Sequence, residues 1–235
     1  MPFRNNDIDK QTAASMVCSL WPSLTEDQRA FISDQVTVSR FQRNDIVYRK
    51  TDTPCSMYVL LHGKVKVVID GVGGRNQIIR AIKPVEMFGY RAYFANASHR
   101  STATAFESSV VASVPMEAIE SVMRENPLMS LQVVRHLSVL LGQSDDRTVN
   151  LTQKHIRGRL AEAILFLKDN YGVEEDGRTL NIYLSREDLA NLSNMTTSNA
   201  IRTLSMFSSE NLIAIDGKKI RILEEAQLRK VSKMG

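Results

Sequence analysis

A run of small polar and basic side chains has the chemistry needed to read the edges of DNA bases: Thr197, Ser198, Asn199 and Arg202. Asparagine pairs bidentately with adenine, arginine with guanine, and serine or threonine with several base-edge groups. In a helix these residues would lie near its first turns and share one exposed face. They form, with Thr196 before them, our candidate base-reading set. The alternative is an ordinary solvated helix face.

Basic side chains near this run could hold the phosphate backbone. Lys218 and Lys219 lie in a predicted hairpin, and Arg186 lies at the start of the preceding predicted helix. Contacts of this kind position a protein on a duplex without reading its sequence. We therefore add these three residues to the candidate DNA-contacting set.

The segment 185–207 predicts a helix-turn-helix that would position these side chains. Ser185 can cap the first helix at Asp188, and Thr196 can cap the second. Asn194 stands at the turn, where the backbone often needs a left-handed conformation that Asn tolerates. The predicted core-facing positions of the second helix recur at helical spacing: Ala200, Leu204 and Phe207.

The elements around this segment predict a winged helix. An amphipathic helix is expected at 158–168, and alternation of Leu180, Ile182 and Leu184 predicts a strand. Apolar runs at 212–215 and 219–223 flank Asp216-Gly217, which favours a hairpin with a type I′ turn.

The preceding part of the chain, from about Phe41 to Pro115, predicts many short strands in an antiparallel roll or barrel. Residues 64–67 alternate in polarity, and Gly71–Gly74 separates them from an apolar run at 78–82. Because GxxxxGK[ST] is absent there, the glycines predict a hairpin turn rather than a phosphate-binding loop.

A long helix is expected at 128–154, after Asn126-Pro127 ends a shorter one. Its apolar stripe predicts a homodimer interface, with a plain core helix as the alternative. The stripe consists of Val133, Leu137, Leu140 and Leu141.

Composition excludes several classes of protein. The 235 residues are 43% hydrophobic, carry a net charge of +4 and include two cysteines, Cys18 and Cys55. Two cysteines exclude a disulfide scaffold and four-thiolate metal sites within one chain. No apolar run approaches the length of a membrane span, and no signal peptide is evident, so a cytoplasmic protein without membrane contact is expected. The sequence lacks HxH, HExxH and a Ser-His-Asp arrangement, so no enzyme, metal or cofactor is predicted.

The whole chain resembles the Crp/Fnr family of bacterial transcription regulators. The resemblance rests on sequence runs in matching order: residues 61–67 (LHGKVKV), Phe88-Gly89, Arg100-Ser101, residues 158–160 (GRL) and the helix-turn-helix. It implies a double-stranded β-helix that binds an effector, a dimerisation helix, and a winged helix-turn-helix that binds double-stranded DNA. RNA polymerase is a further partner that the resemblance implies.

The resemblance also implies an effector pocket, formed by Phe88, Gly89, Tyr90, Arg91, His99, Arg100, Ser101, Thr102 and Ser144. Cyclic-AMP-binding members follow Phe-Gly with a glutamate for the ribose hydroxyl, where this chain has Tyr90. The alignment near Arg100 can shift by one residue, which would exchange the inward and outward side chains.

The family's oxygen sensors need an N-terminal cysteine cluster that this chain lacks, and the histidines are too isolated to predict a haem site. We therefore expect the branch that does not use cyclic AMP.

Together these observations predict an α+β protein. Its expected parts are a β-roll effector domain with flanking helices (1–126), a dimerisation helix and linker (127–154) and a winged helix-turn-helix domain (155–235). We expect a homodimeric regulator of pseudo-palindromic promoter sites. The alternative is an effector-binding module that regulates a partner protein without touching DNA.

Overall fold

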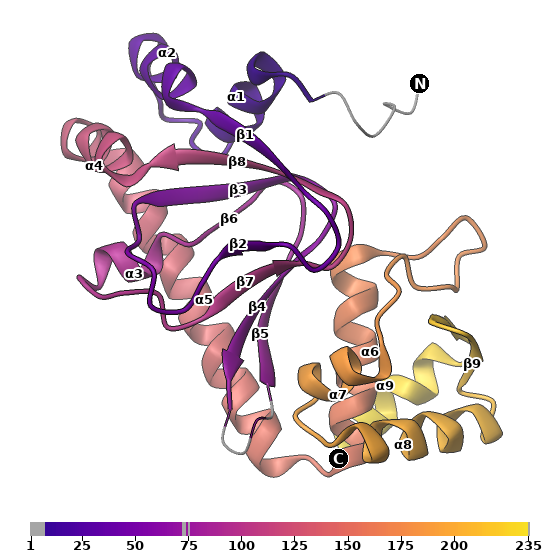
Figure 1. The fold of residues 1–235 in the computed structure, drawn as a ribbon. Helices are drawn as coiled ribbons and strands as arrows, with labels where there is room; N and C mark the ends of the chain where they lie inside the picture. Colours follow the sequence, from indigo (N-terminus) through magenta and orange to yellow (C-terminus); the bar gives the residue numbers. More distant parts are fainter. Residues whose placement is uncertain (1–7, 72–73, 75, 235) are drawn as a thin grey trace. The chain divides into compact units, whose positions relative to one another are not determined.

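The computed structural model describes residues 8–71, 74 and 76–234. The chain divides into two compact units, Met1–Asp70 with Ile79–Leu140 and Gly71–Ile78 with Leu141–Gly235. The predicted α+β architecture is confirmed: a β-roll with flanking helices, a long helix and a winged helix-turn-helix follow one another along the chain (Figure 1).

The β-roll consists of two four-stranded sheets, in the orders β1-β8-β3-β6 and β2-β7-β4-β5. The strands are β1 (Thr37–Phe41), β2 (Ile46–Tyr48), β3 (Ser56–His62), β4 (Val65–Asp70), β5 (Asn76–Ile82), β6 (Glu86–Phe88), β7 (Thr102–Ala105) and β8 (Ser109–Pro115). The glycine-containing turn predicted between β4 and β5 includes Val72 and Gly73, which lie outside the described residues.

Strand β3 is buried on both faces because it separates two apolar cores. Met57, Val59 and Leu61 enter an outer core between the first sheet and the helices. Leu60 enters an inner core between the two sheets, to which Phe88 also contributes. The period of two in side-chain direction divides one apolar strand between the two cores.

Four helices flank the roll: α1 (Lys10–Cys18), α2 (Glu26–Gln35), α3 (Arg91–Phe94) and α4 (Met116–Glu125). Helices α1, α2 and α4 lie on the outer side of the β1-β8-β3-β6 sheet (Figure 1). Thr25 begins α2 with a capping box, since its hydroxyl accepts from the Gln28 amide and the Gln28 side chain accepts from the Thr25 amide.

Helix α5 (Pro127–Gln153) confirms the long helix, and its apolar side chains include both buried and exposed ones. Val133 is 4% exposed and Leu137 is partly buried against the outer core of its own chain. Within the predicted stripe, Val133 is therefore buried, Leu137 and Leu140 are half-buried and Leu141 is exposed, and its role as a dimer interface stays a prediction. The exposed face carries other apolar residues: Leu128, Leu131, Val134, Val139 and Val149.

The second unit contains the winged helix-turn-helix. Its elements are α6 (Ile156–Tyr171), α7 (Arg186–Leu192), α8 (Thr197–Ser209), β9 (Ile213–Asp216), β10 (Lys219–Ile222) and α9 (Glu225–Met234). None of the described helices is both long and apolar enough to cross a membrane.

The predicted strand around Leu180, Ile182 and Leu184 is wrong. All three side chains are buried as the alternation suggested, but the backbone makes only isolated bridges, Val173 with Leu180 and Thr179 with Arg221. The alternating pattern indicates only that every second side chain is buried. An extended segment can bury its side chains in this way without forming the regular hydrogen bonds of a β-sheet.

The predicted type I′ turn is also wrong, although the β9-β10 hairpin is confirmed. Asp216 pairs with Lys219, so the central residues are Gly217 and Lys218. Only Gly217 has a positive φ, at 54°, which is the pattern of a type II′ turn.

Candidate nucleic-acid interface

Local capping fixes the two helices of the helix-turn-helix. The Ser185 hydroxyl accepts a hydrogen bond from the Asp188 amide at 3.0 Å, and the Thr196 hydroxyl accepts from the Asn199 amide at 3.3 Å. Asn194 has φ +50°, the left-handed conformation expected at the turn. These three predictions from sequence are confirmed.

One face of α8 is buried and the other carries the candidate base-reading residues. Ala200, Leu204 and Phe207 are at most 1% exposed, as their spacing predicted. On the opposite face Thr196, Thr197, Ser198 and Arg202 are exposed, and Asn199 is half-buried. The Arg202 Nη2 donates to the Asn199 Oδ1 at 3.1 Å. The fold therefore brings the base-reading set together on one surface.

Arg157 anchors the far end of this helix. Its guanidinium forms a bidentate pair with the Glu210 carboxylate, and its Cζ lies 5.1 Å from the centre of the Phe207 ring. The hydrogen bonds raise the pKa of Arg157 and hold the pKa of Glu210 below its usual value. The C-terminal end of α8 is thereby fixed to the start of α6.

Arg186 faces the hairpin rather than open solvent. Its Nη2 donates to the Gly217 carbonyl at 2.8 Å, and its Nη1 is buried without a hydrogen-bond partner. Its hydrogen bond connects the first turn of α7 to the hairpin turn, and its predicted contact with DNA stays a prediction.

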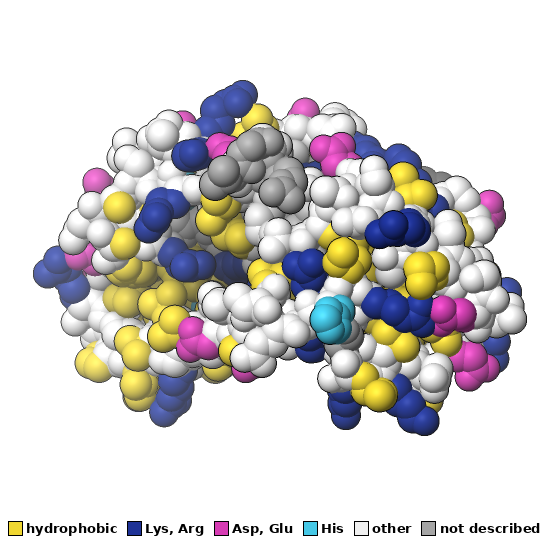
Figure 2. Space-filling view, turned by 90° about the horizontal axis from the view of Figure 1, so that it is seen from below, with side chains coloured by type: hydrophobic (Ala, Val, Ile, Leu, Met, Phe, Trp, Pro, Cys, Tyr) yellow, Lys and Arg dark blue, Asp and Glu magenta, His cyan; other side chains and the backbone are white. Residues whose placement is uncertain are grey.

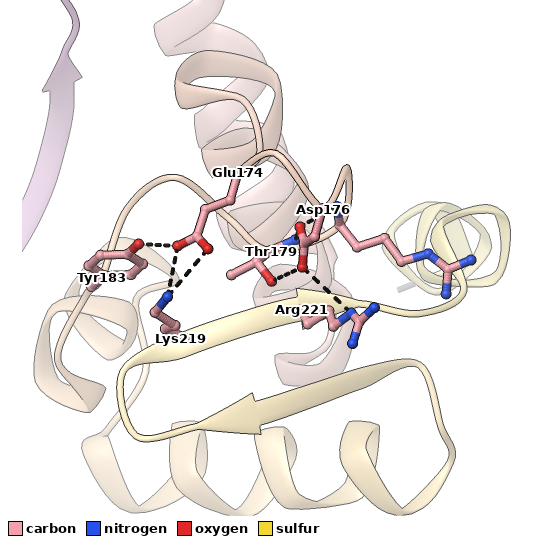
Figure 3. Close-up of polar contacts among 7 residues, drawn as sticks. Glu174, Asp176, Thr179, Tyr183, Lys219 and Arg221 are labelled. Carbon is pink, nitrogen blue, oxygen red and sulfur yellow. Dashed lines mark hydrogen bonds and ion pairs between the residues drawn. The ribbon is translucent and has the colours of Figure 1, made fainter.

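The two candidate lysines of the hairpin have different surroundings. Lys218 is exposed at the turn. The Lys219 Nζ lies 3.1 and 3.3 Å from the Glu174 carboxylate oxygens and 5.2 Å from the centre of the Tyr183 ring (Figure 3). The hydrogen bond to Glu174 raises the pKa of Lys219. Sequence reasoning missed Glu174 and Tyr183 because they lie outside the helix-turn-helix pattern.

The positive charge on the face drawn in Figure 2 is dispersed. On the face drawn in Figure 2, Lys and Arg side chains lie in several separate groups with uncharged and hydrophobic side chains between them. This distribution agrees with the absence of a basic block in the sequence.

Some of the candidate effector residues gather around Tyr48, which sequence reasoning did not single out. The buried His99 ring stacks on the Tyr48 ring with centroids 3.9 Å apart. Burial raises the pKa of Tyr48, and a hydrogen bond with Ser101 partly opposes that effect. Ser101, just before β7, is thus directed toward Tyr48, whereas Arg100 is exposed.

A second tyrosine, Tyr58, fills the space beside the Phe88-Gly89 pair. The Phe88 and Tyr58 rings are 5.5 Å apart, and the Tyr48 and Tyr58 rings are 5.7 Å apart. Gly89 has φ +84°, and a Cβ built there would lie 2.6 Å from the Tyr58 ring. Glycine is required at this position both by the backbone conformation and by the close ring.

The remaining candidate effector residues lie elsewhere. Tyr90 is 1% exposed in the outer core, its hydroxyl is buried without a partner, and burial raises its pKa to about 12. Arg91 is exposed at the start of α3, and the Thr102 hydroxyl accepts from the Lys50 amide at 3.1 Å. Ser144 is exposed on α5, within the second unit.

Two family models match the chain in succession. The model described as a cyclic nucleotide-binding domain matches residues 38–126, and the model described as a Crp-like helix-turn-helix domain matches residues 158–231.

Relatives are similar over most of their length. A CRP-like cAMP-activated global transcriptional regulator of Mycobacterium tuberculosis is 24% identical over 200 residues, which cover 85% of this chain and 89% of that protein. The global nitrogen regulator of a Nostoc species is 28% identical over 188 residues, covering 79% and 84%. The structure of FixK2 from Bradyrhizobium japonicum has the same fold, with a TM-score of 0.76, 19% identity and coverage of 83% and 96%.

The order of the two matched models agrees with the order of the β-roll and the winged helix-turn-helix in the fold. The chain belongs to the Crp/Fnr family of bacterial transcription regulators.

Proposed function

We propose that this regulator binds pseudo-palindromic promoter sites as a homodimer under the control of a small effector other than cyclic AMP. The observation that carries the proposal is the exposed face of α8, where Asn199 and Arg202 lie together beside a buried opposite face. In helix-turn-helix proteins the N-terminal part of the second helix reads base edges in the major groove. Thr196, Thr197 and Ser198 belong to the same proposed contact surface.

The proposed dimer interface is the exposed apolar face of α5. Leu131, Val134 and Leu141 are 44%, 56% and 64% exposed, and they recur at spacings of three and seven residues. These spacings place them on one side of the helix, on a different face from the buried Val133. A twofold dimer through this face would present two α8 helices to half-sites about one DNA turn, roughly 34 Å, apart.

The proposed effector differs from cyclic AMP because the acceptor for its ribose hydroxyl is missing. Tyr90 stands in place of the glutamate, and its side chain lies in the outer core rather than beside Tyr48 and Tyr58. An unpaired buried hydroxyl costs about 1–3 kcal/mol, which weakens binding roughly tenfold to a hundredfold. Calorimetry tests this directly, and a low-micromolar dissociation constant for cyclic AMP would contradict it.

RNA polymerase is the proposed partner at the promoter. The regulator should change transcription from a template that carries its own site and leave a template with a scrambled site unchanged. In vitro transcription with purified polymerase tests this, and an identical effect on both templates would count against specific recruitment.

The DNA-binding proposal as a whole is tested by selection from a random-sequence duplex pool. The selection is performed with and without a boiled, filtered extract of the source cells, so that a missing effector does not hide binding. We expect enrichment of two inverted half-sites with centres about 10 bp apart. Enrichment of a single unrepeated motif would contradict the dimer, and no enrichment under either condition would contradict sequence-specific binding.

A further inference from the structure

Strand β10 presents two cations on its outer face, and both meet carboxylates of one preceding segment (Figure 3). Ile220 and Ile222 are buried, so the alternate residues Lys219 and Arg221 point outward together. The carboxylates that face them come from residues 174–176, between α6 and α7.

Glu174 holds Lys219 with both of its oxygens. The Lys219 Nζ lies 3.1 Å from Oε1 and 3.3 Å from Oε2, and the Tyr183 hydroxyl donates a hydrogen bond to the same carboxylate. The hydrogen bonds from Tyr183 and Lys219 keep the pKa of Glu174 below its usual value. Glu174 is thus an ionised partner for Lys219 at neutral pH.

Asp176 repeats the arrangement beside Arg221. The Arg221 Nε lies 3.8 Å from the Asp176 Oδ2. The Asp176 carboxylate also accepts from the amides of Arg178 and Thr179, at 2.9 and 2.8 Å, and from the Thr179 hydroxyl at 2.6 Å. Chiefly because of the Thr179 bonds, the pKa of Asp176 is lowered to about 2.

The acidic segment is fixed against the hairpin by the backbone. The Leu180 amide donates to the Ile220 carbonyl at 2.9 Å, and the Ile222 amide donates to the Arg178 carbonyl at 3.0 Å. The two cations nevertheless remain about half exposed, with side-chain exposures of 49% for Lys219 and 50% for Arg221. A DNA phosphate can therefore reach them, but only in competition with carboxylates already in place.

We propose that Glu174 is a specificity-determining residue that competes with DNA phosphates for Lys219, and that Asp176 does the same for Arg221. A lysine that is already paired gains less from a phosphate, so Lys219 and Arg221 add little sequence-independent affinity. Discrimination between sites then depends more strongly on the base-reading face of α8. This inference deepens the proposed DNA-binding function and rests on it.

The test compares two substitutions with the same change in charge. Glu174→Gln removes the carboxylate from Lys219 and keeps an acceptor for Tyr183. Glu175→Gln is the matched control, because Glu175 is an exposed neighbour without an ion pair among the described residues. Circular dichroism and thermal melting establish that both variants are folded.

The first readout is affinity for a random-sequence 30-bp duplex as a function of salt. Glu174→Gln should bind it about three to ten times more tightly at 100 mM salt, with a slope of log affinity against log salt steeper by about one unit. Glu175→Gln should differ from the wild type by less than about twofold. Equal gains in both variants, or no gain in Glu174→Gln, would overturn the inference.

A second substitution identifies the lysine responsible. Lys219→Ala should change the affinity of the wild type for random duplex only slightly, but should abolish the gain in the Glu174→Gln background. Persistence of that gain without Lys219 would contradict the pairing as its cause.

Heparin chromatography separates this inference from the DNA-binding proposal. As a polyanion, heparin should retain Glu174→Gln to higher salt than Glu175→Gln whether or not the protein recognises a specific site. Suppose that Glu174→Gln elutes later but the wild type selects no DNA site. The proposed function would then be contradicted, whereas the competition of Glu174 with anions for Lys219 would be supported. If the wild type selects a DNA site but both variants elute at the same salt concentration, only the competition of Glu174 for Lys219 would be contradicted.

Discussion

The Arg202 guanidinium donates a hydrogen bond to the side-chain oxygen of Asn199, 3.1 Å away and one helical turn earlier on the exposed face of α8. The bond uses the Asn199 side-chain oxygen as acceptor and does not involve the amide nitrogen, which is the group that would donate to a base. The two candidate base readers are therefore held as a pair, and the loss of one alters the other.

Arg202→Ala should weaken binding to a selected operator by about 1–3 kcal/mol and change binding to scrambled duplex much less. The reason is that a bidentate contact with guanine distinguishes bases, whereas a phosphate contact does not. Titrations on both duplexes measure the difference. Arg124→Ala is the charge-matched control, since that side chain is 77% exposed in the other unit. If Arg202→Ala lowers both affinities by the same factor, Arg202 holds a phosphate instead.

Lys218→Ala should weaken binding to operator and to scrambled duplex nearly equally. Lys218 is exposed at the hairpin turn, and a phosphate contact there adds about one unit to the salt slope. Isotherms at several salt concentrations give that slope for the wild type and the variant. A selective loss on the operator would assign Lys218 to base reading.

Leu131→Glu and Val134→Glu should each convert the dimer to monomer, because they place a charge in the apolar face of α5. Sedimentation at micromolar concentration measures the association, and Phe31→Glu is the control at an exposed apolar position of α2. Val133→Ala should instead destabilise the fold by roughly 1.5–3 kcal/mol while leaving a dimer, because Val133 is buried in its own chain. A wild type that remains monomeric with operator present would refute the dimer.

Asn194→Ala should lower the stability of the winged helix by about 1 kcal/mol, whereas Asn194→Gly should leave it nearly unchanged or raise it. At φ +50° an alanine side chain is strained, and glycine is not. Thermal melting of both variants checks the order. Equal melting temperatures for the two would show that the turn relaxes to another conformation.

Features set by neighbours in the chain were predictable from sequence, as the helix caps and the turn of the helix-turn-helix show. Ser185, Asn194 and Thr196 act within a few residues of their own position, and the structure has each in its expected role. The buried face of α8 was predictable for the same reason, because helical spacing is a local property.

Features set by distant contacts were not predictable. Apolar spacing identified α5 but not which of its apolar side chains, such as Val133, are buried within their own chain. Lys219 is paired with Glu174 across 45 residues of sequence, and Arg186 bonds the Gly217 carbonyl across 31. The charge of a residue and its position in a motif do not predict which distant residue it will contact in the fold.

The central claim is that the α8 face reads sequence rather than charge. The most direct measurement is the ratio of wild-type affinities for the selected operator and for a scrambled duplex of the same length, at one physiological salt concentration and with the cell extract present. We predict a ratio of at least about 10³ in favour of the operator, as for specific DNA-binding proteins in general. A ratio close to one would contradict the account.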